Sequence, residues 1–111
     1  MLRMKTLEIV YKILLALERA MDLTAFDTAQ IDHDAFGITP ERWARCIEML
    51  CDEGYIKGVR ITVNSIGETK ANVSRMRITL KGIDYLSNNP AMRKIAESTT
   101  GIVTIRFREQ D

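Results

Sequence analysis

The sequence predicts a small α+β domain, and three features of its hydrophobic pattern lead to this class. Apolar residues recur at helical spacing in the first half of the 111-residue chain. Between residues 59 and 80 the spacing changes to alternation, which is typical of strands, and helical spacing then returns. The length and the hydrophobic content of 46% suit one core. We expect this core in a domain of residues 1–98, followed by a tail of residues 99–111.

The first element is expected to be a long helix from Arg3 to Met21. A helix that is apolar around most of its circumference is usually buried on more than one face. We expect the second cover of this helix to come from the C-terminal tail or from a partner subunit. The main apolar stripe consists of Leu7, Val10, Ile13, Leu14, Leu17 and Met21, and another side carries Ile9, Ala16 and Ala20.

A short helical turn and then a third helix are expected next. Asp32 is suited to cap a turn that ends at Gly37. Thr39 is a favourable N-cap and Pro40 is favourable at the first helical position, so a helix is predicted from here to Gly54. Its inward face consists of Trp43, Cys46, Ile47 and Leu50.

Two strands joined by a long loop follow in the prediction. Residues 59–63 and 74–80 alternate between apolar and polar side chains, as strands with one buried face do. The polar residues 64–72 between them, which include Gly67, are predicted to form the loop of an antiparallel hairpin. The inward positions are expected to be Val59, Ile61, Val63, Met76, Ile78 and Leu80.

The rest of the chain is predicted to contain two helices and a strand. Thr79 begins a helix in which Ile83 and Leu86 face inward, and Pro90 opens another helix. Residues 99–111 alternate again, so the tail is expected to form a strand or an arm of a dimer. The apolar side of this strand carries Val103, Ile105 and Phe107.

This order of elements predicts a winged helix, which is a helix-turn-helix core followed by a β-hairpin called the wing, here with an additional C-terminal helix. Two segments, FGITPERWARCIEMLCDEGYIKGV and RITLKGIDYLSNNPAMRKI, resemble the YjcQ family of small winged-helix proteins. The likeness spans about Phe36 to Ile95, and a looser match runs through the first helix. Its strongest elements are GYIKGV and ITLKGIDYL, in this order and spacing.

The resemblance implies a fold rather than an activity. Members of the YjcQ family occur in bacteria and in phages or prophages, and no catalytic residues carry over from them. Relatives usually finish in a basic helix, whereas here that helix is expected to stop near Ser98 and a strand-like tail follows.

Positive charge is concentrated on the predicted wing. The whole chain has a net charge of +1. Residues 59–82 contain five basic residues and one acid, a net charge of +4, and the other 87 residues carry −3. Basic wings contact DNA phosphates and gain affinity by releasing counterions. Lys and Arg also protect exposed strands against pairing with other chains, so both roles stay open for Arg75 and Arg77.

The helix predicted from Thr39 to Gly54 takes the place of the recognition helix. Arg42 and Arg45 are expected to face outward near its start, where arginine can read guanine edges. Carboxylates on the same side repel phosphates and disfavour deep insertion into a groove. Met49, apolar on a charged face, favours contact with a protein. The outward positions are expected to be Glu41, Arg42, Arg45, Glu48, Met49 and Asp52.

The residue patterns favour neither catalysis nor a cofactor nor a metal. His33 stands between Asp32 and Asp34, but adjacent turn residues rarely converge on one ion, and the sequence holds one histidine. Cys46 and Cys51 diverge around a helix, which prevents a disulfide, and neither has a histidine partner in sequence. Free thiols and the lack of a long apolar run indicate a cytoplasmic protein outside the membrane. We therefore expect no enzyme.

Two functions follow from these patterns. The first is a transcriptional regulator of bacterial, phage or prophage origin that binds double-stranded DNA, with the wing on phosphates and the third helix at the major groove. The alternative is a non-enzymatic protein-interaction module that binds a partner through the face around Met49. The expected DNA contacts are Arg42, Arg45, Arg60, Lys70, Arg75, Arg77 and Lys81. In either case we expect a homodimer, with contacts at Ile9, Met92, Ile95, Val103, Ile105 and Phe107.

Overall fold

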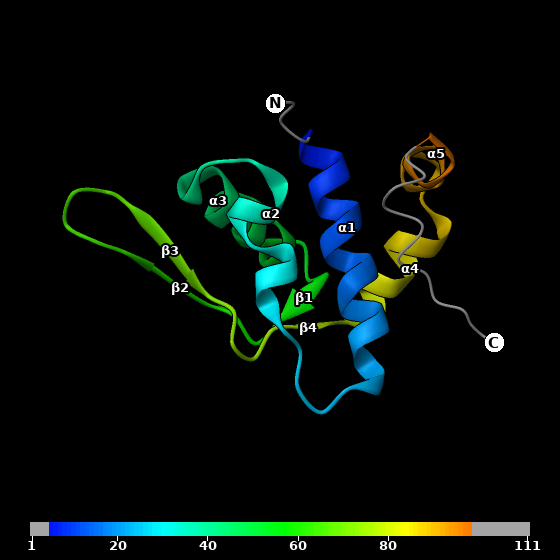
Figure 1. Cartoon of the computed structure of the whole chain (residues 1–111), viewed down its shortest axis with the longest axis horizontal. Helices are drawn as coiled ribbons and strands as arrows, with labels where there is room; N and C mark the ends of the chain where they lie inside the picture. Colours follow the sequence, from blue (N-terminus) through cyan, green and yellow to red (C-terminus); the bar gives the residue numbers. More distant parts are fainter. Residues whose placement is uncertain (1–4, 99–111) are drawn as a thin grey trace.

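The computed structural model describes residues 5–98, so the strand expected at residues 99–111 lies outside the described residues. The described chain is an α+β fold, as the sequence predicts (Figure 1). Its helices are α1 (Thr6–Arg19), α2 (His33–Phe36), α3 (Pro40–Asp52), α4 (Leu80–Asn88) and α5 (Pro90–Ser98). The 3₁₀ turns η1 (Ala20–Asp22) and η2 (Thr28–Ile31) lie between α1 and α2. Its strands are β1 (Ile56–Lys57), β2 (Arg60–Val63), β3 (Thr69–Asn72) and β4 (Arg77–Ile78).

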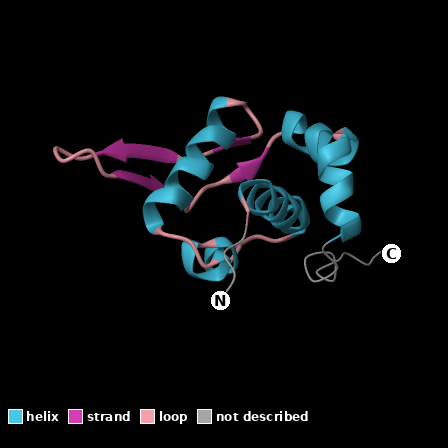
Figure 2. Cartoon of the chain, turned by 90° about the horizontal axis from the view of Figure 1, so that it is seen from above, coloured by secondary structure: helices cyan, strands magenta, loops and turns pink. Residues whose placement is uncertain are grey.

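Helix α1 lies in the middle of the fold, between α2 and α3 on one side and α4 and α5 on the other (Figures 1 and 2). On the α3 side, Ile13 and Leu14 are completely buried in the main core. On the other side, Tyr11 and Leu15 form a second apolar cluster with Met92 of α5. The prediction that this helix is buried on more than one face is therefore confirmed. The second cover in the structure is α5 of the same chain, which the sequence analysis did not expect.

The ends of α1 differ from the prediction. The helix stops at Arg19, and Met21 lies in η1 with 63% of its surface exposed. Leu7, in the first helical turn, is also largely exposed, whereas Ile9 is completely buried although it lies off the predicted main stripe. The apolar pattern thus extends along the chain beyond the part of the helix that neighbouring elements cover.

The start of α3 follows the prediction closely. The Thr39 hydroxyl accepts a hydrogen bond from the amide of Arg42 at 3.1 Å, and Pro40 occupies the first helical position. The indole N–H of the buried Trp43 donates to the carbonyl of Ile31 at 2.7 Å, which ties α3 to η2. Because the partner is a backbone group of another element, this bond fixes the position of the buried indole between the two segments.

The pairing of the strands differs from the predicted hairpin. β2 pairs with β3, which lies inside the expected loop, and β4 pairs with β1 (Figure 1). The tip of the hairpin is only residues 64–68, where the Asn64 side-chain oxygen accepts hydrogen bonds from two following amides. The expected second strand is broken by a turn in which Met76 N–H donates to the Val73 carbonyl at 3.0 Å. β3 escapes sequence analysis because Ala71 is its only apolar side chain.

Leu80 shows the consequence of the shorter strand β4, which ends at Ile78. It was expected to face inward at the end of a strand, but it is the first residue of α4 and is 83% exposed. Thr79 caps α4 as predicted, since its hydroxyl accepts from the Gly82 amide at 3.0 Å. A Cβ atom at Gly82 would lie 2.2 Å from the Tyr55 carbonyl oxygen, so a glycine is required where α4 crosses the segment before β1. Val63, near the hairpin tip, is also exposed rather than inward.

Truncation of Met92 tests the second cluster. We expect Met92→Ala to lower the free energy of unfolding by about 2–4 kcal/mol, because a completely buried side chain leaves a cavity between α1 and α5. Leu80→Ala is the matched control and is expected to change stability by less than about 0.5 kcal/mol, because Leu80 is exposed. Urea denaturation followed by circular dichroism measures both. Equal effects of the two variants would contradict the packing of α5 on α1.

Candidate nucleic-acid interface

The β2–β3 hairpin projects from the helices and has one apolar and one polar face (Figures 1 and 2). Ile61 lies opposite Ala71 in the register, and both are half-buried toward the core. The next pairs on the outer face are Arg60 with Asn72 and Thr62 with Lys70. The outer face is therefore a continuous polar surface that carries Arg60, Thr62, Lys70 and Asn72, all exposed.

A hollow of about 510 Å³ lies at the base of this hairpin. Gly58 makes it possible, because a Cβ atom there would lie 2.1 Å from the Arg75 carbonyl oxygen and φ is +81°. The close approach places two arginines, Arg60 and Arg75, on the wall of one hollow together with the hydroxyl of Ser74. The lining residues are Gly58, Val59, Arg60, Asn72, Ser74 and Arg75, and none of them is acidic.

The short β1–β4 sheet adds a second pair of cations. Lys57 lies directly opposite Arg77, and both side chains are exposed. Like charges opposite each other on a sheet destabilise the pairing unless an anion lies between or near them. Lys57 is not among the expected DNA contacts because it precedes residues 59–82, the segment in which the sequence concentrates positive charge. The alternation of buried Ile56 with exposed Lys57 was the available signal.

These five cations are not neutralised by the rest of the described chain. Within residues 5–98, Lys57, Arg60, Lys70, Arg75 and Arg77 form no ion pair with a carboxylate. The single acid between residues 56 and 78 is Glu68, whose carboxylate accepts from the Asn64 side-chain amide at 2.8 Å at the hairpin tip. The hairpin and its base therefore present open positive charge, which attracts polyanions.

Helix α3 is joined to the hairpin through one carboxylate. One oxygen of Glu41 accepts a hydrogen bond from the backbone amide of Thr69 in β3 at 3.1 Å. The other oxygen accepts from the Nε of Arg45 at 3.2 Å. Glu41, expected to be one of the outward acids of this helix, thus holds the hairpin against α3 and also pairs with the exposed Arg45.

Arg42 is not placed as predicted. Its guanidinium turns toward α1, where Nη2 donates to the hydroxyl of Thr6 at 2.6 Å, and Nε is buried without a hydrogen-bond partner in the described part of the chain. The guanidinium therefore does not lie on the outward face of α3, because the first turn of α3 packs beside the start of α1. The exposed strip of α3 is reduced to Arg45, Met49 and Asp52.

Lys81 is also separated from the hairpin. Its ammonium lies 5.8 Å from the centre of the Tyr55 ring, which is a cation–π distance, and its stem lies beside Gly54. Tyr55 in turn stacks on Tyr85 of α4, with ring centres 4.4 Å apart. The expected DNA contacts thus fall into a hairpin group, Arg45 on the adjoining helix α3 and a separate Lys81. The structure does not bring Arg42 into any of them.

Comparison with known proteins supplies the family. The profile of the family described as YjcQ protein matches residues 11–103. The chain belongs to the YjcQ family. The searches of curated proteins and of solved structures found no match.

The expected dimer contacts of this YjcQ family member need correction. Ile9 and Met92 are both completely buried inside the chain, where they offer no surface to a second copy. Ile95 is half-buried and packs against the Met92 cluster. The sequence shows that α1 is apolar on two sides, but it does not show whether the same chain or a second copy covers each side. Residues on the side that α5 covers were therefore expected at a dimer interface. Val103, Ile105 and Phe107 lie outside the described residues.

The thiols and the histidine of this YjcQ protein have ordinary structural surroundings. Burial raises the pKa of the Cys46 thiol, and burial together with Asp52 and Glu48 raises the pKa of the Cys51 thiol, which disfavours a thiolate nucleophile at either position. His33 lies 3.1 Å from the Asp34 carboxylate. Among residues 5–98, no cluster of three His, Cys, Asp or Glu side chains is placed to hold a metal. The same residues contain no helix with the length and hydrophobicity needed to cross a membrane.

The link between α3 and the hairpin can be tested by hydrogen exchange. We expect Glu41→Ala to raise the exchange rate of the Thr69 amide by about tenfold or more, because a hydrogen bond to a charged acceptor contributes about 1.5–3 kcal/mol. Glu48→Ala removes a half-buried acid from the same helix and is expected to leave Thr69 unchanged. Amide exchange followed by NMR reports on both. Thr69 protection that survives in Glu41→Ala would mean that the hairpin is held by packing alone.

Proposed function

We propose that this YjcQ family member binds double-stranded DNA and acts as a transcriptional regulator, as a winged helix in which the β2–β3 hairpin is the wing. The observation that carries the proposal is the set of five cations on residues 56–78 that lack acidic partners among residues 5–98. Phosphate contacts by Lys and Arg supply sequence-independent affinity, and this set lies along one projecting hairpin and its base.

In this proposal the hollow at the base of the wing is the main phosphate site. Arg60 and Arg75 line it, and no carboxylate lines the same hollow. The Ser74 hydroxyl, also on the wall, donates to the Asn72 side-chain oxygen at 2.9 Å. Charge-assisted bonds from guanidinium to phosphate are short and strong, and two of them on one wall fix the register of a backbone. Lys70 extends the positive surface along the wing, and Lys57 with Arg77 extends it toward the helical body.

Helix α3 contributes less to DNA binding than in a typical recognition helix. Of its two candidate arginines, Arg42 is engaged by Thr6, and Arg45 is paired with Glu41. Of the other positions expected to face outward on this helix, the exposed ones are Met49, which is apolar, and Asp52, which is acidic. We therefore propose that affinity comes mainly from the wing, and that any direct reading of bases by α3 depends on Arg45.

A protein-interaction module is the second candidate. Met49 is 48% exposed on α3 and stands beside Asp52 on the strip that the wing leaves open. An apolar side chain in such a position suits contact with a protein better than contact with phosphates. This candidate takes precedence if the wing has no affinity for DNA.

A salt titration tests the wing directly. We expect the protein to bind a labelled duplex of arbitrary sequence at low salt and to lose affinity steeply as salt rises. Arg60→Ala combined with Arg75→Ala is expected to weaken binding at low salt by about tenfold or more and to reduce the slope of log K against log salt by about 1.8, or 0.9 for each lost phosphate contact. Fluorescence anisotropy gives both quantities.

The matched control removes the same charge elsewhere. Arg93→Ala combined with Lys94→Ala changes two exposed cations of α5 and is expected to keep the salt slope of the natural chain. If this control loses as much DNA affinity as the wing variant, the net charge of the protein rather than the wing determines binding. No binding at low salt would reject the DNA proposal and favour the interaction module.

A further inference from the structure

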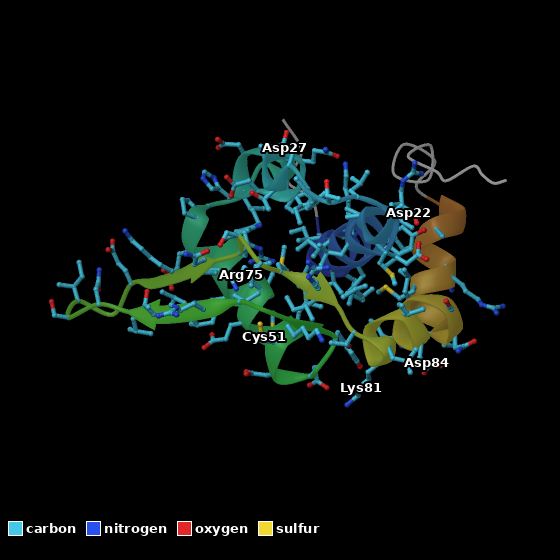
Figure 3. All side chains as sticks on the ribbon, turned by 90° about the horizontal axis from the view of Figure 1, so that it is seen from below. Asp22, Asp27, Cys51, Arg75, Lys81 and Asp84 are labelled. Atoms are coloured by element: carbon cyan, nitrogen blue, oxygen red, sulfur yellow. The ribbon has the colours of Figure 1, made fainter. Side chains whose placement is uncertain are left out.

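A second hollow lies on the other side of Arg75, and the proposed DNA contact does not account for its lining. It is a groove of about 450 Å³ between the segment that follows α1 and the segment from Val73 to Ile78. Figure 3 places Arg75 at the base of the hairpin, apart from Asp22 and Asp27 of the facing segment. The volume is within the range of small-molecule sites, about 300–1,000 Å³.

The floor and one lip of the groove are apolar. Leu17, Met76 and Ile78 are nearly buried and form the inner lining. Met21 and Leu23 stand on the lip with 63% and 57% of their surfaces exposed. Exposed apolar side chains that border a hollow gain free energy when a ligand covers them, and methionine adapts readily to the shape of a ligand.

The opposite wall is cationic. Lys57, Arg75 and Arg77 all line the groove, and none of its lining residues is acidic. Lys57 and Arg77 face each other across the β1–β4 pair without an anionic partner among the described residues. An anionic group between them would relieve their repulsion. Thr24 also lines the groove, and its hydroxyl is a polar partner for an oxygen atom of a ligand. The Ser74 hydroxyl, in contrast, donates to the Asn72 side-chain oxygen.

We propose that this groove binds a small organic carboxylate with an apolar body. The carboxylate lies at the Lys57–Arg77 pair, where charge-assisted hydrogen bonds are available, and the apolar body covers the floor between Leu17 and Met76 under the Met21–Leu23 lip. An inorganic anion or a DNA phosphate would satisfy the cations and leave the apolar lip exposed. The proposal does not depend on the DNA proposal, although Arg75 and Arg77 belong to both.

The probe is 2-naphthoate, and its uncharged analogue 2-naphthalenemethanol is the matched ligand. We expect 2-naphthoate to bind with a Kd on the order of 0.1 mM, and the alcohol to bind at least about tenfold more weakly. Isothermal titration calorimetry gives the affinities, and amide chemical shifts locate the site. The shifts are expected in residues 20–28 and 73–78.

Two pairs of variants separate the two halves of the site. The double variant Lys57→Ala, Arg77→Ala is expected to weaken the binding of 2-naphthoate by about tenfold, to an affinity close to that of the alcohol. The control Lys70→Ala, on the outer face of the hairpin, is expected to leave the affinity unchanged. The double variant Met21→Ser, Leu23→Ser is expected to weaken the binding of both ligands. The control is Ile66→Ser at the hairpin tip, where Ile66 is 77% exposed, and it is expected to leave both affinities unchanged. All of these side chains are exposed, so the fold is expected to survive each change.

The proposal is overturned by equal affinity for the acid and the alcohol, by shifts that centre outside the groove, or by groove variants that bind like the natural chain. It is also overturned if 2-naphthoate shows no binding at about ten times the expected Kd. Because no DNA is present in any of these measurements, their failure leaves the DNA proposal unchanged. Failure of the DNA titration likewise leaves the groove open to this test.

Discussion

Burial of α1 from two sides by the same chain is the constraint on which the rest of the structure depends. Ile13 and Leu14 anchor the main core with α3, and Tyr11 and Leu15 anchor the smaller cluster with Met92. A domain of this size has few fully buried side chains. A helix whose side chains pack in two clusters therefore contributes a large share of the hydrophobic stabilisation of the domain. With α1 held in this way, α3 and α4 have fixed places on either side of it, and the strands between them follow from those places.

The position of the hairpin is a consequence of this arrangement. The Trp43–Ile31 hydrogen bond fixes α3, the Thr79 hydroxyl joins the start of α4 to the Gly54 carbonyl at 2.5 Å, and the β1–β4 pair spans the space between the two helices. The β2–β3 hairpin then leaves this short sheet and passes along α3, where Glu41 holds it. Its cations stand on the side that faces away from the core because the alternating apolar residues occupy the other side.

Arg75 is the residue at which the proposed activities meet. It lines the polar hollow beside Arg60 and the amphipathic groove beside Arg77, on two sides of the same turn. The proposed carboxylate lies at Lys57 and Arg77, and Arg77 also belongs to the positive surface proposed for DNA. Under both proposals together, an organic anion at Arg77 would compete with the phosphate backbone for this guanidinium.

The helices could be predicted from the sequence, whereas the strand pairing could not, and the difference has a physical reason. The cap at Thr39, the turn from Asp32 to Gly37 and the cap at Thr79 are local hydrogen-bonding patterns that a few neighbouring residues determine. Strand partners lie far apart in sequence, and β3 has almost no hydrophobic signal because Ala71 is its only apolar residue. The alternation between residues 74 and 80 pointed to a longer strand than the chain forms.

The candidate sites likewise have some features that the sequence determines and others that the tertiary packing determines. The sequence by itself determined the α+β class, the family likeness, the caps and the concentration of positive charge near the hairpin, because each depends on residue type and near neighbours. Only the tertiary structure decided that Arg42 turns to Thr6, that Lys57 stands opposite Arg77, and that Ile9 and Met92 are interior. These outcomes depend on which distant segments pack together, and side-chain direction is set by that packing rather than by the local pattern.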